Sequence, residues 1–188
     1  MGILRDKLMG KKAAPLNNDN NAAYKEIFTI IADHDEGVIS EVLYCIDNPR
    51  IFSKKNDDLF DERGINGQTA SEFKIKWIGC VEIMLRHGCA VEFDHNVSFD
   101  DFYEGFGKLK LVEQRGILPK DDDIYLDYEL TNWVSCIDRI WAKSGLCVGC
   151  IDIDSDSYVL FVCTVEQLTK LSKLAEDVGR KITRAAEV

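Results

Sequence analysis

The sequence contains no long uncharged apolar segment. No run of about 18 apolar residues occurs, so no segment is predicted to span a membrane as a helix. The opening stretch MGILRDKLMGKKAAPL carries a charge every few positions and therefore lacks the apolar core of a secretory signal peptide. Asp6 stands where a myristoylation signal requires Ser or Thr, so no lipid anchor is predicted either. We expect a cytoplasmic protein that has no membrane partner.

Positive charge is scarce. The chain has 23 Lys and Arg residues against 33 Asp and Glu residues, which gives a formal net charge of -10. A protein with this balance repels phosphates and anionic lipids, so no nucleic acid partner is expected. A basic protein surface would be attracted instead. High acidity also serves solubility alone, and composition does not choose between these two roles.

The short motifs that mark common catalytic sites are missing as well. The sequence has no P-loop, no GxGxxG, no GxSxG and no HExxH. Paired acids are frequent, but they lie in polar runs, whereas a catalytic acid needs a desolvated carboxyl group with a raised pKa. We therefore assign no catalytic residue, no metal and no cofactor.

The length and the apolar content fit one folded domain. A chain of 188 residues suits a single domain, and its 46% hydrophobic residues can fill a core. Residues 1–21 end in the polar stretch KKAAPLNNDNN and are predicted to form a flexible N-terminal arm, with residues 22–188 as the domain. The seven cysteines are predicted to be free thiols in a reducing compartment.

Three segments show clear helical spacing of apolar residues: 70–87, 128–144 and 165–186. Apolar stripes on the first two contain all the tryptophans, which we interpret as core residues rather than ligand platforms; these are Trp77, Trp133 and Trp141.

Shorter segments complete the predicted helices and loops. Residues 21–36, 38–46 and 99–109 are predicted to be short helices. Residues 47–68, with at most a helical turn at 56–62, and residues 110–123 are predicted to be surface loops.

Three strands are predicted, at residues 89–94, 146–153 and 157–163. The last two flank the turn sequence DSDS and form a hairpin. The fold class is therefore α+β: a small, largely antiparallel sheet of about three or more strands, with amphipathic helices packed against one face.

The CxxC sequence of Cys147 and Cys150 resembles half of a metal site. On a strand, however, residues three positions apart point to opposite faces and cannot bind one ion together. No second CxxC exists, and a thioredoxin-type pair would begin a helix. We interpret both cysteines as buried thiols.

The alternating acids Asp152, Asp154 and Asp156 resemble the start of an EF-hand loop. Counted from Asp152, position 6 is Ser157 instead of Gly, and position 12 is Cys163 instead of Glu. Aspartate and serine are typical of tight turns, where their side chains accept hydrogen bonds from nearby amides. We predict an acidic turn whose tip could bind a basic partner.

A nucleophilic Cys–His pair is conceivable in the stretch RHGCAVEFDH. His87, Cys89 and His95 are close in sequence there. His87 ends a helix, however, where a cation is favoured without any catalytic reason. Cys89 begins a strand and His95 follows it.

Residues 70–182 carry a recognisable order of features: a helix, a glycine, a strand ending in an acid, a short helix, and later an acidic hairpin before a final helix. The hairpin pattern consists of Ile151, Asp152, Asp154, Asp156, Tyr158 and Leu160. This order resembles a bacterial family of small cytosolic proteins catalogued only as a domain of unknown function. The resemblance implies no activity and no catalytic residues.

In its small size, acidic charge and lack of a catalytic motif, the predicted cytosolic domain resembles the immunity proteins that bacteria pair with toxins. Our leading hypothesis is such a protein, which neutralises a cognate toxin by occluding its basic cleft, since complementary charge speeds association. The predicted contact residues are Asp57, Asp58, Asp61, Glu62, Asp121, Asp122, Asp123, Asp154 and Asp156.

Two alternatives remain open. The first is an enzyme with a hidden carboxylate or Cys–His site, which requires a pocket of converging polar groups with shifted pKa values. The second is a regulatory module that binds an unknown ligand.

Overall fold

The computed structural model describes residues 20–124 and 129–188. Of the predicted arm, residues 1–19 lie outside these ranges, and positions 20 and 21 belong to the first helix. No helix within the described ranges is both long and apolar enough to cross a bilayer.

Helices and strands follow the pattern of an α+β protein. The helices are α1 (Asn20–Ile31), α2 (Glu36–Asp47), α3 (Pro49–Lys55), α4 (Asp57–Glu62), α5 (Glu72–Arg86), α6 (Phe99–Gly107), α7 (Lys110–Arg115), α8 (Leu130–Trp141) and α9 (Val165–Asp177). The strands are β1 (Val91–Phe93), β2 (Leu146–Ile151), β3 (Tyr158–Thr164) and β4 (Ile182–Arg184). Short 3-10 turns are η1 (Asp121–Asp123), η2 (Ala142–Ser144) and η3 (Ala185–Glu187).

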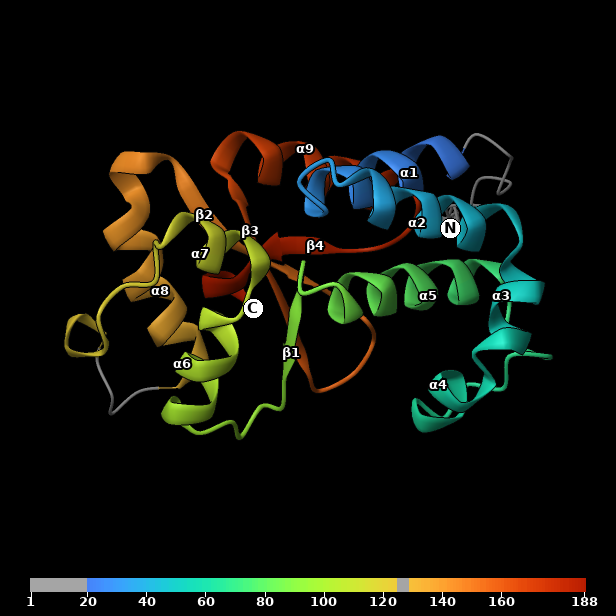
Figure 1. Ribbon diagram of the computed structural model, residues 1–188, viewed down its shortest axis with the longest axis horizontal. Helices are drawn as coiled ribbons and strands as arrows, with labels where there is room; N and C mark the ends of the chain where they lie inside the picture. The colour runs from blue at the N-terminus through green and yellow to red at the C-terminus, as the bar shows by residue number, and fades with distance from the viewer. Residues whose placement is uncertain (1–19, 125–128) are drawn as a thin grey trace, which may run out of the picture.

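The four strands form one antiparallel sheet in the order β1-β3-β2-β4 (Figure 1). The predicted hairpin is its centre, because β2 and β3 pair from Leu146↔Thr164 to Ile151↔Val159. The antiparallel sheet and the α+β class are confirmed, and β4 is an additional edge strand.

Helices cover both faces of this sheet, so the expectation of helices on one face was wrong (Figure 1). One face carries Cys147, Phe161 and Cys163, and packs against α1, α5 and α9. The other face carries Val148 and Leu160, and packs against α6 and α8. Burial on both faces explains why β2 is a continuous apolar run instead of an alternating one.

The long helix α5 packs against α2 and α3 and also contacts the β2–β3 hairpin. Its first turn is capped by Ser71, whose hydroxyl accepts a hydrogen bond from the Lys74 amide. Trp77 is fully buried, and its Nε1 donates a hydrogen bond of 2.8 Å to the carbonyl oxygen of Asp152. The prediction that all three tryptophans are core residues is confirmed, since Trp133 and Trp141 are also buried.

The last predicted helix was too long. Thr164 caps α9 in a capping box with Gln167, but the helix ends at Asp177. Gly179 then adopts a left-handed conformation with φ of 65°, which reverses the chain into β4.

The two predicted surface loops also contain helices. Residues 47–68 form α3 and α4, which insert Phe52 and Phe60 into the core as an edge-to-face pair. Residues 110–123 contain α7, whose Val112 is buried.

Candidate functional site

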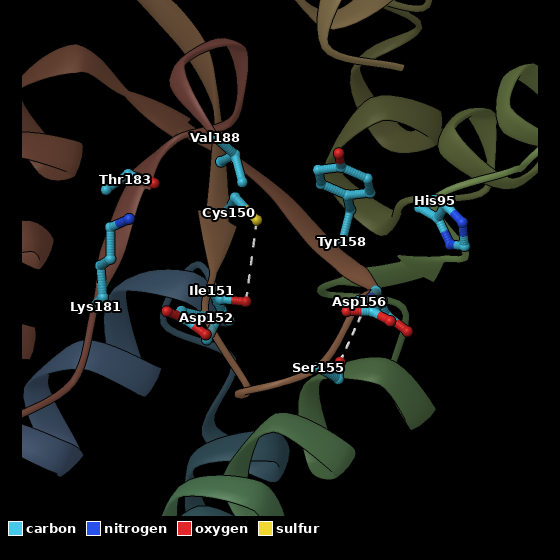
Figure 2. Close-up of a pocket in the computed structure, with 11 residues that line it drawn as sticks. His95, Cys150, Ile151, Asp152, Ser155, Asp156, Tyr158, Lys181, Thr183 and Val188 are labelled. Atoms are coloured by element: carbon cyan, nitrogen blue, oxygen red, sulfur yellow. Dashed lines mark hydrogen bonds between the residues drawn. The ribbon is translucent and has the colours of Figure 1, made fainter. Parts of the chain in front are cut away.

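A hollow of about 540 Å³ lies beside the turn between β2 and β3 (Figure 2). Asp152 and Lys181 lie on one side of it, and Asp156 and His95 on the other. The full lining is His95, Cys150, Ile151, Asp152, Ser155, Asp156, Ser157, Tyr158, Lys181, Thr183 and Val188. The hollow therefore combines acids, one lysine, an imidazole and several hydroxyl groups.

Local hydrogen bonds build the turn itself. The Oδ1 atom of Asp152 accepts a hydrogen bond of 2.9 Å from the Asp154 amide, and Ser155 Oγ accepts one of 3.2 Å from the Ser157 amide. Asp154 has φ of 59°, a left-handed conformation that aspartate tolerates better than most residues. The prediction of an acidic turn stabilised by its own side chains is confirmed.

Arg180 fastens this turn to the core. Its guanidinium group lies 2.8 Å from a carboxylate oxygen of Asp154 and 4.3 Å from the ring centroid of Phe73, with Trp77 at 5.6 Å. The Arg180 side chain is only 9% exposed, whereas that of Asp154 is 68% exposed. Asp154 thus already forms an ion pair with a residue of its own chain. Two acids of the turn, Asp154 and Asp156, were predicted to contact a partner, and of these only Asp156 lines the hollow.

The contact between Arg180 and the turn was not predicted from the sequence. Arg180 falls within the segment predicted to continue α9, so its place beneath the turn was missed. The available signal was Gly179, a typical residue for the end of a helix.

The CxxC cysteines separate as predicted, with Cys147 on one face of the sheet and Cys150 on the other. Burial raises the pKa of Cys150, which lines the hollow, to about 11. Its thiol therefore stays protonated at neutral pH and is a poor nucleophile. Within residues 20–124 and 129–188, no group of three or more His, Cys, Asp or Glu side chains is placed to hold a metal ion.

The described geometry does not assemble the conceivable Cys–His pair. Cys89 Sγ lies 3.9 Å from the main-chain oxygen of His87, while His87 Nε2 lies 3.3 Å from Glu41. Burial raises the pKa of Cys89, which keeps its thiol protonated. His95 lines the hollow, with Nδ1 3.1 Å from Asp94 and Nε2 2.7 Å from the Asn96 side-chain nitrogen.

Comparison with known protein families gives one match. Residues 23–186 match the family described as Domain of unknown function (DUF6630). The chain belongs to this family. No curated protein and no solved structure matches the chain. The matched range runs from α1 to η3 and so includes the whole sheet, the acidic turn and Arg180.

The predicted contact acids of this DUF6630 domain lie in three separate places. Exposed carboxylates on α4 form what we name the α4 cluster: Asp57, Asp58, Asp61 and Glu62. The exposed acids of η1, Asp121, Asp122 and Asp123, form the η1 cluster. The two clusters lie toward opposite ends of the long axis (Figure 1), so they do not form one surface.

A second hollow of about 540 Å³ borders the α4 cluster. Asp57 and Asp61 line it together with Arg50 and Lys54. Arg50 is already engaged, because it donates hydrogen bonds of 3.2 Å to the carbonyl oxygens of Gly67 and Gln68. The acids of the α4 cluster form no ion pair with any residue that the structure describes.

Proposed function

We propose that this DUF6630 protein is an immunity-type inhibitor that binds a protein toxin and covers its basic cleft with the α4 cluster. The observation that carries the proposal is the set of four exposed carboxylates on one short helix without a cation partner in the described chain. Many other acids of this protein are paired, such as Asp35 with Lys110 and Glu41 with Arg86. Among the described residues, the acids of the η1 cluster are unpaired as well, but α4 brings four such acids together on one helix, against three in η1.

Unpaired like charges favour a basic partner. Burial raises the pKa of Glu82, the charge and hydrogen bond of Arg63 lower it, and Glu92 and Glu62 make lesser contributions that raise it. Within the α4 cluster, Asp57 and Asp61 are four positions apart on the helix, as are Asp58 and Glu62, and like charges at this spacing repel each other. Cations from a partner would relieve this repulsion, and the same field would steer the partner's approach.

The helix that carries the α4 cluster is anchored in the hydrophobic core. Phe60 is fully buried beneath it, with its ring centroid 6.4 Å from that of Phe52. A helix anchored in this way presents its charges in a fixed arrangement, which lowers the ordering cost of binding. Because the η1 cluster lies toward the other end of the molecule, we assign the primary contact to α4 alone.

Co-expression tests the proposal. The product of the adjacent gene is expressed with this protein, and the mixture is analysed by gel filtration and by growth of the host. A 1:1 complex together with restored growth is the expected result. Separate elution and unrelieved toxicity would contradict the inhibitor function.

A second candidate function rests on the hollow at the β2–β3 turn. Its mixed charges, from Lys181, Asp152 and Asp156, suit a small ligand that carries both charges, as an enzyme substrate or a regulatory ligand would. A thermal-shift screen against amino acids, sugar phosphates and nucleotides tests this function. A Tm increase that disappears in Lys181→Ala would support it, and an unchanged Tm with every compound would reject it.

A further inference from the structure

Two buried thiols face each other across the central strands. Cys147 of β2 and Cys163 of β3 are direct partners in the antiparallel register and are 0% and 2% exposed. Side chains at such positions share one face, with β-carbons about 4.5–5.5 Å apart. A disulfide requires β-carbons about 3.5–4.5 Å apart, so a small local adjustment would suffice. Both cysteines are free thiols in this structure.

The two thiols differ in acidity. The neighbouring Cys163 thiol lowers the pKa of Cys147, and Cys147 in turn raises the pKa of Cys163, which burial raises further. The positive charge of Arg184 also lowers the pKa of Cys147, against the opposing effects of burial and of Asp138. Cys147 is therefore the better nucleophile of the pair.

Arg184 also connects this buried site to the surface. Its Nη1 lies 3.4 Å from Asp138, and its side chain is 32% exposed. We expect movement of this partly exposed side chain to give a small oxidant access to Cys147.

We infer that Cys147 and Cys163 form an oxidisable dithiol that a hydroperoxide converts to a disulfide. The Cys147 thiolate attacks one peroxide oxygen, the O–O bond breaks, and the released hydroxide takes up the proton that Cys147 lost. The resulting sulfenic acid is attacked by the Cys163 sulfur, which loses its proton as water leaves. In sum, two thiols and one hydrogen peroxide give one disulfide and two waters. This inference is independent of the proposed toxin binding.

The other buried cysteines provide internal controls. Cys45 and Cys80 are also neighbouring thiols, but both are fully buried, and burial raises the pKa of Cys80 well above its ordinary value. Cys150 lies on the same strand as Cys147 and faces Leu160 across the sheet, where no second sulfur is available. We expect these three thiols to remain reduced at peroxide doses that oxidise Cys147 and Cys163.

Peptide mapping of the full chain tests the inference. The reduced protein is treated with hydrogen peroxide, denatured, alkylated and cleaved before aspartate, which separates Cys163 from Cys147 and Cys150. The expected first product is a cross-linked peptide pair that is lighter by two hydrogen atoms than its reduced parts. This product should persist in Cys150→Ser and be absent in Cys147→Ser. Arg184→Gln should slow its formation several-fold, and Arg184→Lys less.

Three results would overturn the inference. The first is full alkylation of Cys147 and Cys163 at a dose that already oxidises the half-buried Cys89. The second is a cross-link between Cys45 and Cys80 that forms earlier. The third is a cross-link that survives in Cys147→Ser. The wild-type map decides the first two even if a variant fails to fold.

Discussion

At the scale of single residues, Arg180 determines where the acidic turn lies. Its guanidinium group stacks on Phe73 and Trp77 while it pairs with Asp154, so one side chain joins the turn, α5 and the end of α9. Trp77 adds a direct bond to the Asp152 carbonyl. These contacts hold the turn at Asp152 and Asp154 against α5.

Substitution of Arg180 separates stacking from charge pairing. We predict that Arg180→Ala lowers the free energy of unfolding by about 2–3 kcal/mol, because desolvated stacking and the buried stem are lost together with the ion pair. Asp154→Asn should cost less than about 1 kcal/mol, since its carboxylate is largely exposed and asparagine tolerates a positive φ. Urea denaturation of the two variants measures both values. If both variants lost the same free energy of unfolding, the stabilisation would come from the ion pair and not from stacking on Phe73 and Trp77.

Asp35 gives a prediction about pH. The hydrogen bond from Lys110 is the largest cause that lowers the pKa of Asp35 below its ordinary 3.8, and the amides of Val38 and Gly37 contribute. A lowered pKa in the folded state means that Asp35 stabilises the fold above pH 3.8 and that this contribution is lost as the pH falls through the lowered value.

Asp35→Asn tests this sign. Asparagine can still cap α2 but does not titrate, so the variant should lose less stability than wild type as the pH falls below 3.8. Thermal unfolding across that range measures the difference, with Asp33→Asn as a neighbouring control. Parallel stability curves for wild type and Asp35→Asn would contradict the role of the Lys110 bond.

Several residue-level expectations followed from the sequence because they depend only on local periodicity. The opposite directions of Cys147 and Cys150, the burial of Trp77 and the hydrogen bonds within the turn are of this kind. The contact of Arg180 with the turn could not be predicted in this way. It joins positions 26 residues apart and exists only because the chain reverses at Gly179.

At the scale of elements, β2 and β3 are fitted to each other at Gly149. A β-carbon added there would lie 2.3 Å from a ring carbon of Phe161, which is fully buried. Glycine is required at this position because the ring of Phe161 leaves no room for a side chain. The backbone conformation there is an ordinary one that other residues also adopt.

Gly149→Ala should destabilise the protein by about 1–3 kcal/mol, because Phe161 must move within a packed core. The double variant Gly149→Ala/Phe161→Leu should lose less than the sum of the single losses, since leucine leaves room for the new methyl group. Chemical denaturation of the three variants measures this coupling. Additive losses would mean that the ring and the strand relax independently.

The elements missed from the sequence are short. β4 has three residues, of which only Ile182 is buried, so no alternation could be recognised. α4 coincides with the helical turn predicted at 56–62, and Phe60 is its one buried residue within a charged run that is otherwise typical of a loop. Such segments acquire structure from tertiary packing, whereas long periodic segments such as α5 and α8 are defined by their own pattern.

At the scale of the whole molecule, the excess of acid is divided between distant surfaces. The α4 cluster and the η1 cluster lie toward opposite ends of the long axis, so one basic cleft would engage one of them (Figure 1). Reversing the charge of one cluster therefore tests that cluster alone.

Charge reversal of the α4 cluster should leave the fold intact. Changing its four acids to lysine removes favourable acids from the first turn of α4, at about 0.3–1 kcal/mol each for Asp57 and Asp58, but it also removes mutual repulsion. Phe60 remains buried in either case. Circular dichroism and Tm measurements check this expectation, with the exposed pair Glu176→Lys/Asp177→Lys as a control of similar type. A large loss of Tm in the α4 variant alone would show that the acids have a structural role.

The association rate of the complex, measured by stopped flow at low and high salt, tests the central claim most directly. For wild type and the Glu176→Lys/Asp177→Lys control, we predict fast association that slows as salt screens the attraction. The α4 variant should associate at least about tenfold more slowly and with little dependence on salt. An α4 variant with the wild-type rate and salt dependence would contradict the assignment of α4 as the surface that binds a basic partner.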